Sequence, residues 1–178
     1  MELAYTRFPR VQIWRRGVAS LIDFVGIWLL SSLLGGNRPG FQFAQVVVFV
    51  LAWWGARVLL VYGNQGQSLG RWALDMKVLD PELGKVPSMP SLAKREAVMG
   101  FCALLVAIAL GNIATNAGAV VLMVPLAIDC GFALSDNTQR QAIHDRIART
   151  MIVSTRRGYS IDIKVKRLLA QLRRRVIK

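Results

Sequence analysis

Three ionisable residues lie inside long apolar stretches of the sequence. Asp23, Arg57 and Asp129 are each about six residues from the polar end of their stretch, roughly 9 Å along a helix. An isolated charge at that depth in lipid costs at least about 2.5 kcal/mol, so we expect Arg57 to pair with one or both aspartates. Two carboxylates and one guanidinium leave one negative charge, which a proton or a cation would neutralise. The trio is therefore a candidate intramembrane charge site; the alternative is a staple that only fixes helix register.

The neighbours of the trio suit buried positions. Trp53 and Trp54 lie one turn from Arg57, where an indole ring could stack on the guanidinium. Pro125 precedes Asp129 by four residues and lacks a backbone donor, so it predicts a kink in that helix close to the acid.

The composition indicates which solvent surrounds these residues. The 178 residues are 54% hydrophobic, yet 23 Lys and Arg against 10 Asp and Glu give a net charge of +13. A soluble domain would have to hide this apolar surface within a self-repelling chain. A bilayer accommodates both features, because apolar segments enter lipid while basic segments stay at the anionic cytoplasmic face.

The apolar stretches predict an all-α membrane fold, a bundle of four transmembrane helices. We expect spans at about 18–34, 43–62, 97–110 and 117–134. The last two come from one uncharged run that would make a helix of about 48 Å, too long for a core of about 30 Å, so it should fold back near 111–116. The first stretch contains Asp23 and lacks a cleavage site, so we expect it to be retained rather than removed as a signal peptide.

Basic residues are distributed unevenly among the segments that flank these spans. One arginine, Arg38, lies in the first predicted loop and none lies in 111–116, whereas the N-terminus, segment 63–96 and the C-terminal tail hold nearly all the others. This pattern predicts a multi-pass protein of the inner (cytoplasmic) membrane with both termini in the cytoplasm. In segment 63–96, runs 73–79 and 85–87 flank a turn at 80–84 and predict a small β-hairpin, to which 150–154 could add a third strand.

Residues 158–178 are expected to form a basic amphipathic tail, separate from a membrane domain at 1–157. An apolar stripe at 161, 165, 168, 172 and 176 would lie on the membrane while basic residues contact anionic headgroups; a solvated basic tail is the alternative. The predicted lipid-facing basic residues are Lys164, Lys166, Arg167, Arg173, Arg174 and Arg175.

The sequence offers no set of metal ligands and no catalytic triad. His144 is the only histidine, and Cys102 and Cys130 lie in apolar runs where a thiol acts as a small hydrophobe. We therefore expect no cofactor, no metal and no enzymatic activity.

Three ordered segments resemble the RDD family of small membrane proteins, named for one arginine and two aspartates. They are 16–23 (RGVASLID), 66–78 (GQSLGRWALDMKV) and 140–153 (RQAIHDRIARTMIV). The resemblance places Arg16 and Asp23 at the family's first arginine and aspartate, while Asp129 and Asp145 both remain candidates for the second aspartate. The other motif residues are Gly66, Gly70 and His144. The resemblance also implies a cation/proton antiport role, which is attributed to some members.

Two functions remain open from the sequence. One is a cation/proton transporter or transporter component that uses the buried acids; four spans are few for this task, so a homo-oligomer or membrane complex would be required. The other is a non-catalytic membrane adaptor that binds anionic lipid or a partner through its basic cytoplasmic surface. Nucleic acid is not an expected partner, because lipid accounts for the basic excess.

Overall fold

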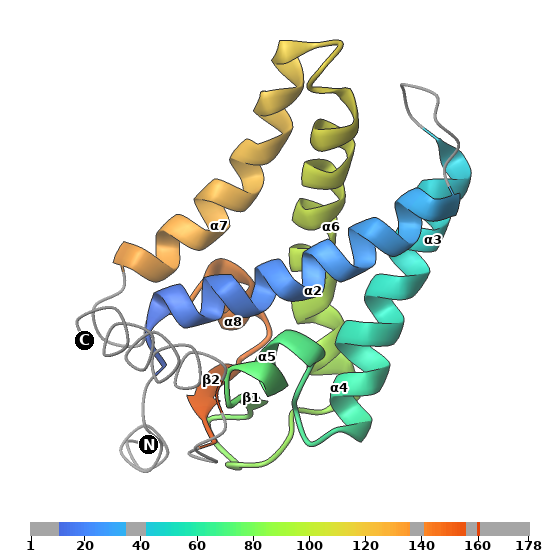
Figure 1. The fold of residues 1–178 in the computed structure, drawn as a ribbon. Helices are drawn as coiled ribbons and strands as arrows, with labels where there is room; N and C mark the ends of the chain where they lie inside the picture. The colour runs from blue at the N-terminus through green and yellow to red at the C-terminus, as the bar shows by residue number, and fades with distance from the viewer. Residues whose placement is uncertain (1–10, 35–41, 136–140, 156–159, 161–178) are drawn as a thin grey trace, which may run out of the picture.

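The computed structural model describes residues 11–34, 42–135, 141–155 and 160, and it is mainly helical (Figure 1). The first loop with Arg38, the tail stripe and all six predicted lipid-facing basic residues lie outside the described residues, as does the boundary near 157. The amphipathic tail therefore stays a prediction.

Long helices form the body of the protein. Helix α2 runs over Ile13–Leu34, and α3 over Phe43–Trp54 continues through a π-helical segment, η1, at Gly55–Leu59 into α4 at Leu60–Gly63. Helix α6 covers Met89–Asn112, and a 3-10 segment, η2, at Ala117–Met123 leads into α7 at Val124–Ser135. Three stretches, Ile13–Leu33, Phe43–Gly63 and Ala117–Ser135, are long and apolar enough to cross a membrane.

The third predicted span behaves differently from the other three. Residues 97–110 lie within α6, but this helix begins at Met89, so it carries Arg95 and Glu96 in its first half. It is not among the three stretches that qualify by length and composition, and the count of four spans remains a prediction. The predicted bend is confirmed, because α6 ends at Asn112 and the chain turns before Ala117.

Pro125 lies within a helical stretch over Ala117–Ser135, at the point where the 3-10 segment η2 passes into α7. The predicted kink itself stays a prediction, but the change in helix geometry coincides with the residue that lacks a backbone donor. The irregularity therefore lies at the junction of η2 and α7, before the turn that carries Asp129.

Short elements gather at one end of the long helices. They are α5 at Leu69–Ala73, β1 at Met76–Leu79, α8 at Ile143–Ile147 and β2 at Met151–Ser154, and we call them the cap (Figure 1). Strands β1 and β2 pair antiparallel, with Met76 opposite Ser154 and Leu79 opposite Met151. The predicted local hairpin is wrong: residues 85–87 form no strand, and β1 pairs with the run at 150–154 instead.

The apolar core lies between α2, α3 and α6. Ile27, Phe49, Trp53 and Met99 pack there, with the rings of Phe49 and Trp53 stacked at 5.7 Å between centroids. Many other large apolar side chains on the long helices face outward, including Leu33 and Leu51. Such a surface is typical of helices solvated by lipid.

Candidate functional site

Arg57 lies at the centre of a buried ionic network near the cap end of the long helices. Its Nη1 donates to Asp23 Oδ2 at 2.5 Å and its Nε donates to Glu96 Oε2 at 3.0 Å. The guanidinium carbon lies 5.2 Å from the centre of the Trp53 ring. The pairing of Arg57 with Asp23 and its stacking on Trp53 are thus both present, whereas Trp54 is partly exposed at the surface.

The π-helical segment explains how Arg57 reaches two carboxylates. One wide turn at Gly55–Leu59 changes the direction in which the side chain leaves α3, and single π turns of this kind often occur at functional sites. Arg57 is 1% exposed, so its charge depends on the two partners on α2 and α6.

Asp23 is fully engaged by the cap as well as by Arg57. Ser68 Oγ donates to Asp23 Oδ2 at 2.6 Å, and the backbone N–H of Gly70 donates to Oδ1 at 2.7 Å. A Cβ at Gly70 would lie 2.0 Å from the carbonyl oxygen of Ala19, so only glycine allows this close approach of α5 to α2. Asp23 therefore joins the cap to the first long helix.

Glu96 is the acid with the most cationic partners in the described network. It accepts from Arg57, from Arg71 Nη2 at 3.0 Å and from Arg95 Nη1 at 3.4 Å. Arg71 is the least well compensated of the three, because its Nη1 is buried without a hydrogen-bond partner. Burial, together with the like charges of Arg57 and Arg95, lowers the pKa of Arg71 to about 9.

Asp145 extends the network to α8. It accepts from Arg95 Nε at 2.9 Å through Oδ1 and forms an ion pair with Arg16 through Oδ2. Burial opposes the charge, but Arg95 and Arg16 outweigh it and hold the pKa of Asp145 well below its usual range. Arg16, Asp23 and Asp145 thus belong to one connected set.

Asp129 does not contact Arg57, which corrects the idea that all three intramembrane charges converge. It accepts instead from the backbone N–H of His144 at 3.0 Å and contacts His144 Nδ1 at 2.5 Å. The other ring nitrogen of His144 lies 3.3 Å from Arg95 Nη2. In the part of the chain that the structure describes, Asp129 joins the network through His144 on α8.

The excess negative charge inferred from the sequence is also absent from this network. Among the described residues that compose it, four carboxylates face four guanidiniums, so the carboxylates do not outnumber the guanidiniums. The acids are Asp23, Glu96, Asp129 and Asp145, and the arginines are Arg16, Arg57, Arg71 and Arg95.

Gly66, the other glycine of the motif, also has a structural role. Its φ is +86°, and a Cβ there would lie 2.4 Å from the carbonyl oxygen of Val78. Its own carbonyl accepts from the N–H of Val78 at 2.9 Å, which fixes the loop against β1. Gly66 and Gly70 therefore hold the cap in place.

Arg71, Arg95 and Glu96 were not predicted as site residues, because segment 63–96 reads as a polar loop. One signal was present: Ser88 followed by Pro90 is typical of a helix start, and a helix beginning there carries Arg95 and Glu96 into the apolar stretch. For Arg71 we find no comparable local signal.

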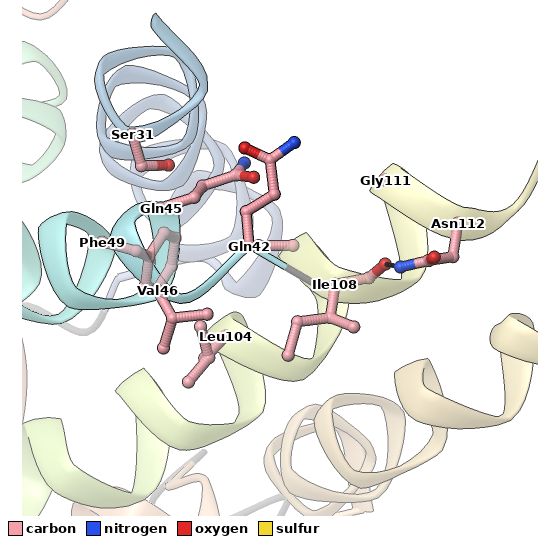
Figure 2. Close-up of a pocket in the computed structure, with 10 residues that line it drawn as sticks. Ser31, Gln42, Gln45, Val46, Phe49, Leu104, Ile108, Gly111 and Asn112 are labelled. Atoms are coloured by element: carbon pink, nitrogen blue, oxygen red, sulfur yellow. Dashed lines mark hydrogen bonds between the residues drawn. The ribbon is translucent and has the colours of Figure 1, made fainter. Parts of the chain in front are cut away.

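A small polar pocket lies at the far end of α2, α3 and α6, away from the cap (Figure 2). Ser31, Gln42, Gln45 and Asn112 contribute its polar groups, and its volume of about 30 Å³ is enough for one or two water molecules. Phe49 also lines it, and the stacked pair of Phe49 and Trp53 lies between this pocket and Arg57.

The chain was also compared with known protein families. The model of the RDD family matches residues 10–149, which include Arg16, Asp23, both motif glycines and the His144–Asp145 pair. The chain belongs to the RDD family. No curated protein and no solved structure matches it. In this RDD protein the motif residues therefore build the ionic network and its attachment to the cap.

Proposed function

We propose that this RDD protein is a non-catalytic membrane adaptor, which anchors a rigid, basic cap at the cytoplasmic face of the cell membrane. The observation that carries the proposal is the pairing of the buried carboxylates with an equal number of guanidiniums among the described residues of the network. A site that exchanges cations needs an acid with free oxygen lone pairs, whereas Asp23 accepts three hydrogen bonds and Glu96 is shared by three arginines. Such a network suits a lock between the cap and the long helices.

The surface of the cap, together with the loop after β1 and the first turns of α6, supports contact with anionic headgroups. In segments 64–96 and 141–155, the exposed charged residues are one acid, Glu82, and four bases: Lys85, Lys94, Arg146 and Arg149. Each base near an anionic surface contributes about 1 kcal/mol. The same asymmetry favours a cytoplasmic cap and cytoplasmic termini.

Lipid selectivity tests the adaptor directly. Spin-labelled phosphatidylglycerol should be enriched over phosphatidylcholine around the reconstituted protein, and the paired change Lys85→Gln and Lys94→Gln should reduce that enrichment. Glu82→Gln, which removes the exposed acid, should leave the enrichment equal or higher. Equal selectivity in the wild type and the lysine variant would show that the basic surface does not recruit these lipids.

A second candidate, proton-linked cation transport, is favoured by the pair formed by Asp129 and His144. His144 Nδ1 lies 2.5 Å from Asp129 Oδ2, so a proton shared by these two side chains would link α8 to α7. In this case the ionic network would open during a transport cycle, and a homo-oligomer would supply the path by which the cation crosses the membrane.

Flux through proteoliposomes separates the two candidates. The adaptor predicts no pH-dependent cation exchange above that of protein-free liposomes. Exchange that Asp23→Asn or Asp129→Asn abolishes, while Glu82→Gln retains it and all variants stay folded, would replace the adaptor with a transporter.

A further inference from the structure

Helix α5 buries its polar residues and exposes its apolar ones, which is the reverse of a helix at a water-facing surface. Ser68 at its N-cap, Gly70 and Arg71 are buried, whereas Leu69 and Trp72 are 63% and 58% exposed. A helix at a water-facing surface buries its apolar residues and exposes its charged ones. The arrangement in α5 indicates an apolar solvent outside it.

The position of α5 along α2 places it at the depth of the bilayer interface, where acyl chains provide an apolar solvent. Helix α5 lies alongside α2 (Figure 1). Its contacts to α2 are at Ala19, which is adjacent to Gly70, and at Asp23, which accepts from Ser68 and Gly70. Both residues belong to a stretch that is long and apolar enough to span a membrane. Asp23 is about six residues, or roughly 9 Å, from the predicted polar end of the first span, and interfacial helices bury their apolar face about 5–10 Å into the boundary of headgroups and acyl chains.

Contacts with the buried ionic network explain why α5 lies at this depth. On the inner side of α5, Arg71 joins Glu96 and Ser68 joins Asp23, so α5 covers part of the network from outside. A short helix that satisfies its polar groups inward and presents leucine and tryptophan outward can enter lipid without leaving polar side chains uncompensated. Tryptophan is enriched at this level of the bilayer because its ring is amphipathic.

We propose that α5 is inserted into the bilayer leaflet on the cap side, where Leu69 and Trp72 contact lipid at the boundary of headgroups and acyl chains. The segment after the second span is then a re-entrant element that walls off the ionic network from water, and only the part from β1 onward lies in the aqueous phase. This placement does not depend on whether the protein acts as an adaptor or as a transporter.

Site-directed spin labelling of the full chain in liposomes tests the placement. Cys102 and Cys130 are replaced by alanine, and single cysteines are introduced by Leu69→Cys or Trp72→Cys and labelled with a nitroxide. The matched controls are Leu83→Cys, 70% exposed in the turn after β1, and Leu29→Cys, 52% exposed on the predicted first span. Power saturation then compares collisions with oxygen, which concentrates in lipid, and with a water-soluble nickel complex.

The proposal predicts that labels at 69 and 72 collide more with oxygen than with nickel, as the label at 29 does, while the label at 83 shows the reverse. Labels at 69 and 72 that behave like the label at 83 would place α5 in water and overturn the proposal. It would also fail if both positions were shielded from both reagents and became mobile on dilution with unlabelled protein, because a second copy of the chain would then cover α5. Two labelled positions guard against a local effect of either substitution.

Discussion

Replacing Glu96 by glutamine should unbalance the buried network more than any other conservative change. The variant keeps the shape of the side chain but removes the one negative charge shared by Arg57, Arg71 and Arg95. Four carboxylates against four guanidiniums then become three against four, which leaves one positive charge uncompensated in a site that is 0% exposed at Glu96.

The expected loss of stability follows from the cost of breaking a buried ion pair, about 3–5 kcal/mol. At about 2–4 °C per kcal/mol for a chain of this size, Glu96→Gln should lower the midpoint of thermal unfolding by about 6–20 °C. The midpoint can be followed by circular dichroism in a mild detergent. The matched control, Glu82→Gln, changes an exposed glutamate and should alter stability by no more than about 0.5 kcal/mol.

A second substitution makes the test specific for charge. Arg71→Met removes the guanidinium that already has an unpartnered nitrogen, so it should recover part of the loss when combined with Glu96→Gln. A Glu96→Gln midpoint within about 2 °C of the wild type, under the same scaling, would refute the reasoning. So would a double variant that is less stable than Glu96→Gln alone.

Two further changes probe the contacts that hold the cap. Gly70→Ala should destabilise the protein by about 1–3 kcal/mol or more, because its Cβ would lie 2.0 Å from the Ala19 carbonyl oxygen. The control, Gly17→Ala, should be neutral or stabilising, because nothing lies within 4 Å of its Cβ. Equal thermal midpoints of the two variants would contradict this. Asp145 has a folded-state pKa held below its unfolded value, so its contribution is present above about pH 4 and is lost as the pH falls further. Thermal midpoints measured from pH 7 to pH 3 should therefore fall on the acid side, less steeply in Asp145→Asn; parallel profiles would rule out this role for Asp145.

The sequence predicted those features that follow from hydrophobic length and from the cost of a charge in lipid. Length predicted the bend between α6 and η2, and the cost of an isolated charge predicted that Arg57 would meet Asp23. Both arguments use one segment, or one pair of charges, at a time.

The sequence did not predict the features that depend on contacts between distant segments. Asp129 is paired with His144 because α8 returns beneath α7, and the pairing of β1 with the strand at Met151–Ser154 depends on the same return of the chain. The π turn at Arg57 was not predicted either, because Gly55, the poorest helix former in it, does not by itself specify a π turn. The excess negative charge counted within the predicted spans was wrong for a related reason. Arg71 and Arg16 belong to the network but lie outside those spans.

Hydrogen–deuterium exchange, compared between the wild type and Glu96→Gln in detergent, tests most directly whether the network locks the cap to the long helices. The account predicts that amides of α5, β1, α8 and β2 lose protection in the variant, while those of α3 keep it. Cap amides that exchange at the same rate in both proteins would contradict the account, because the cap would then be held by something other than the buried charges.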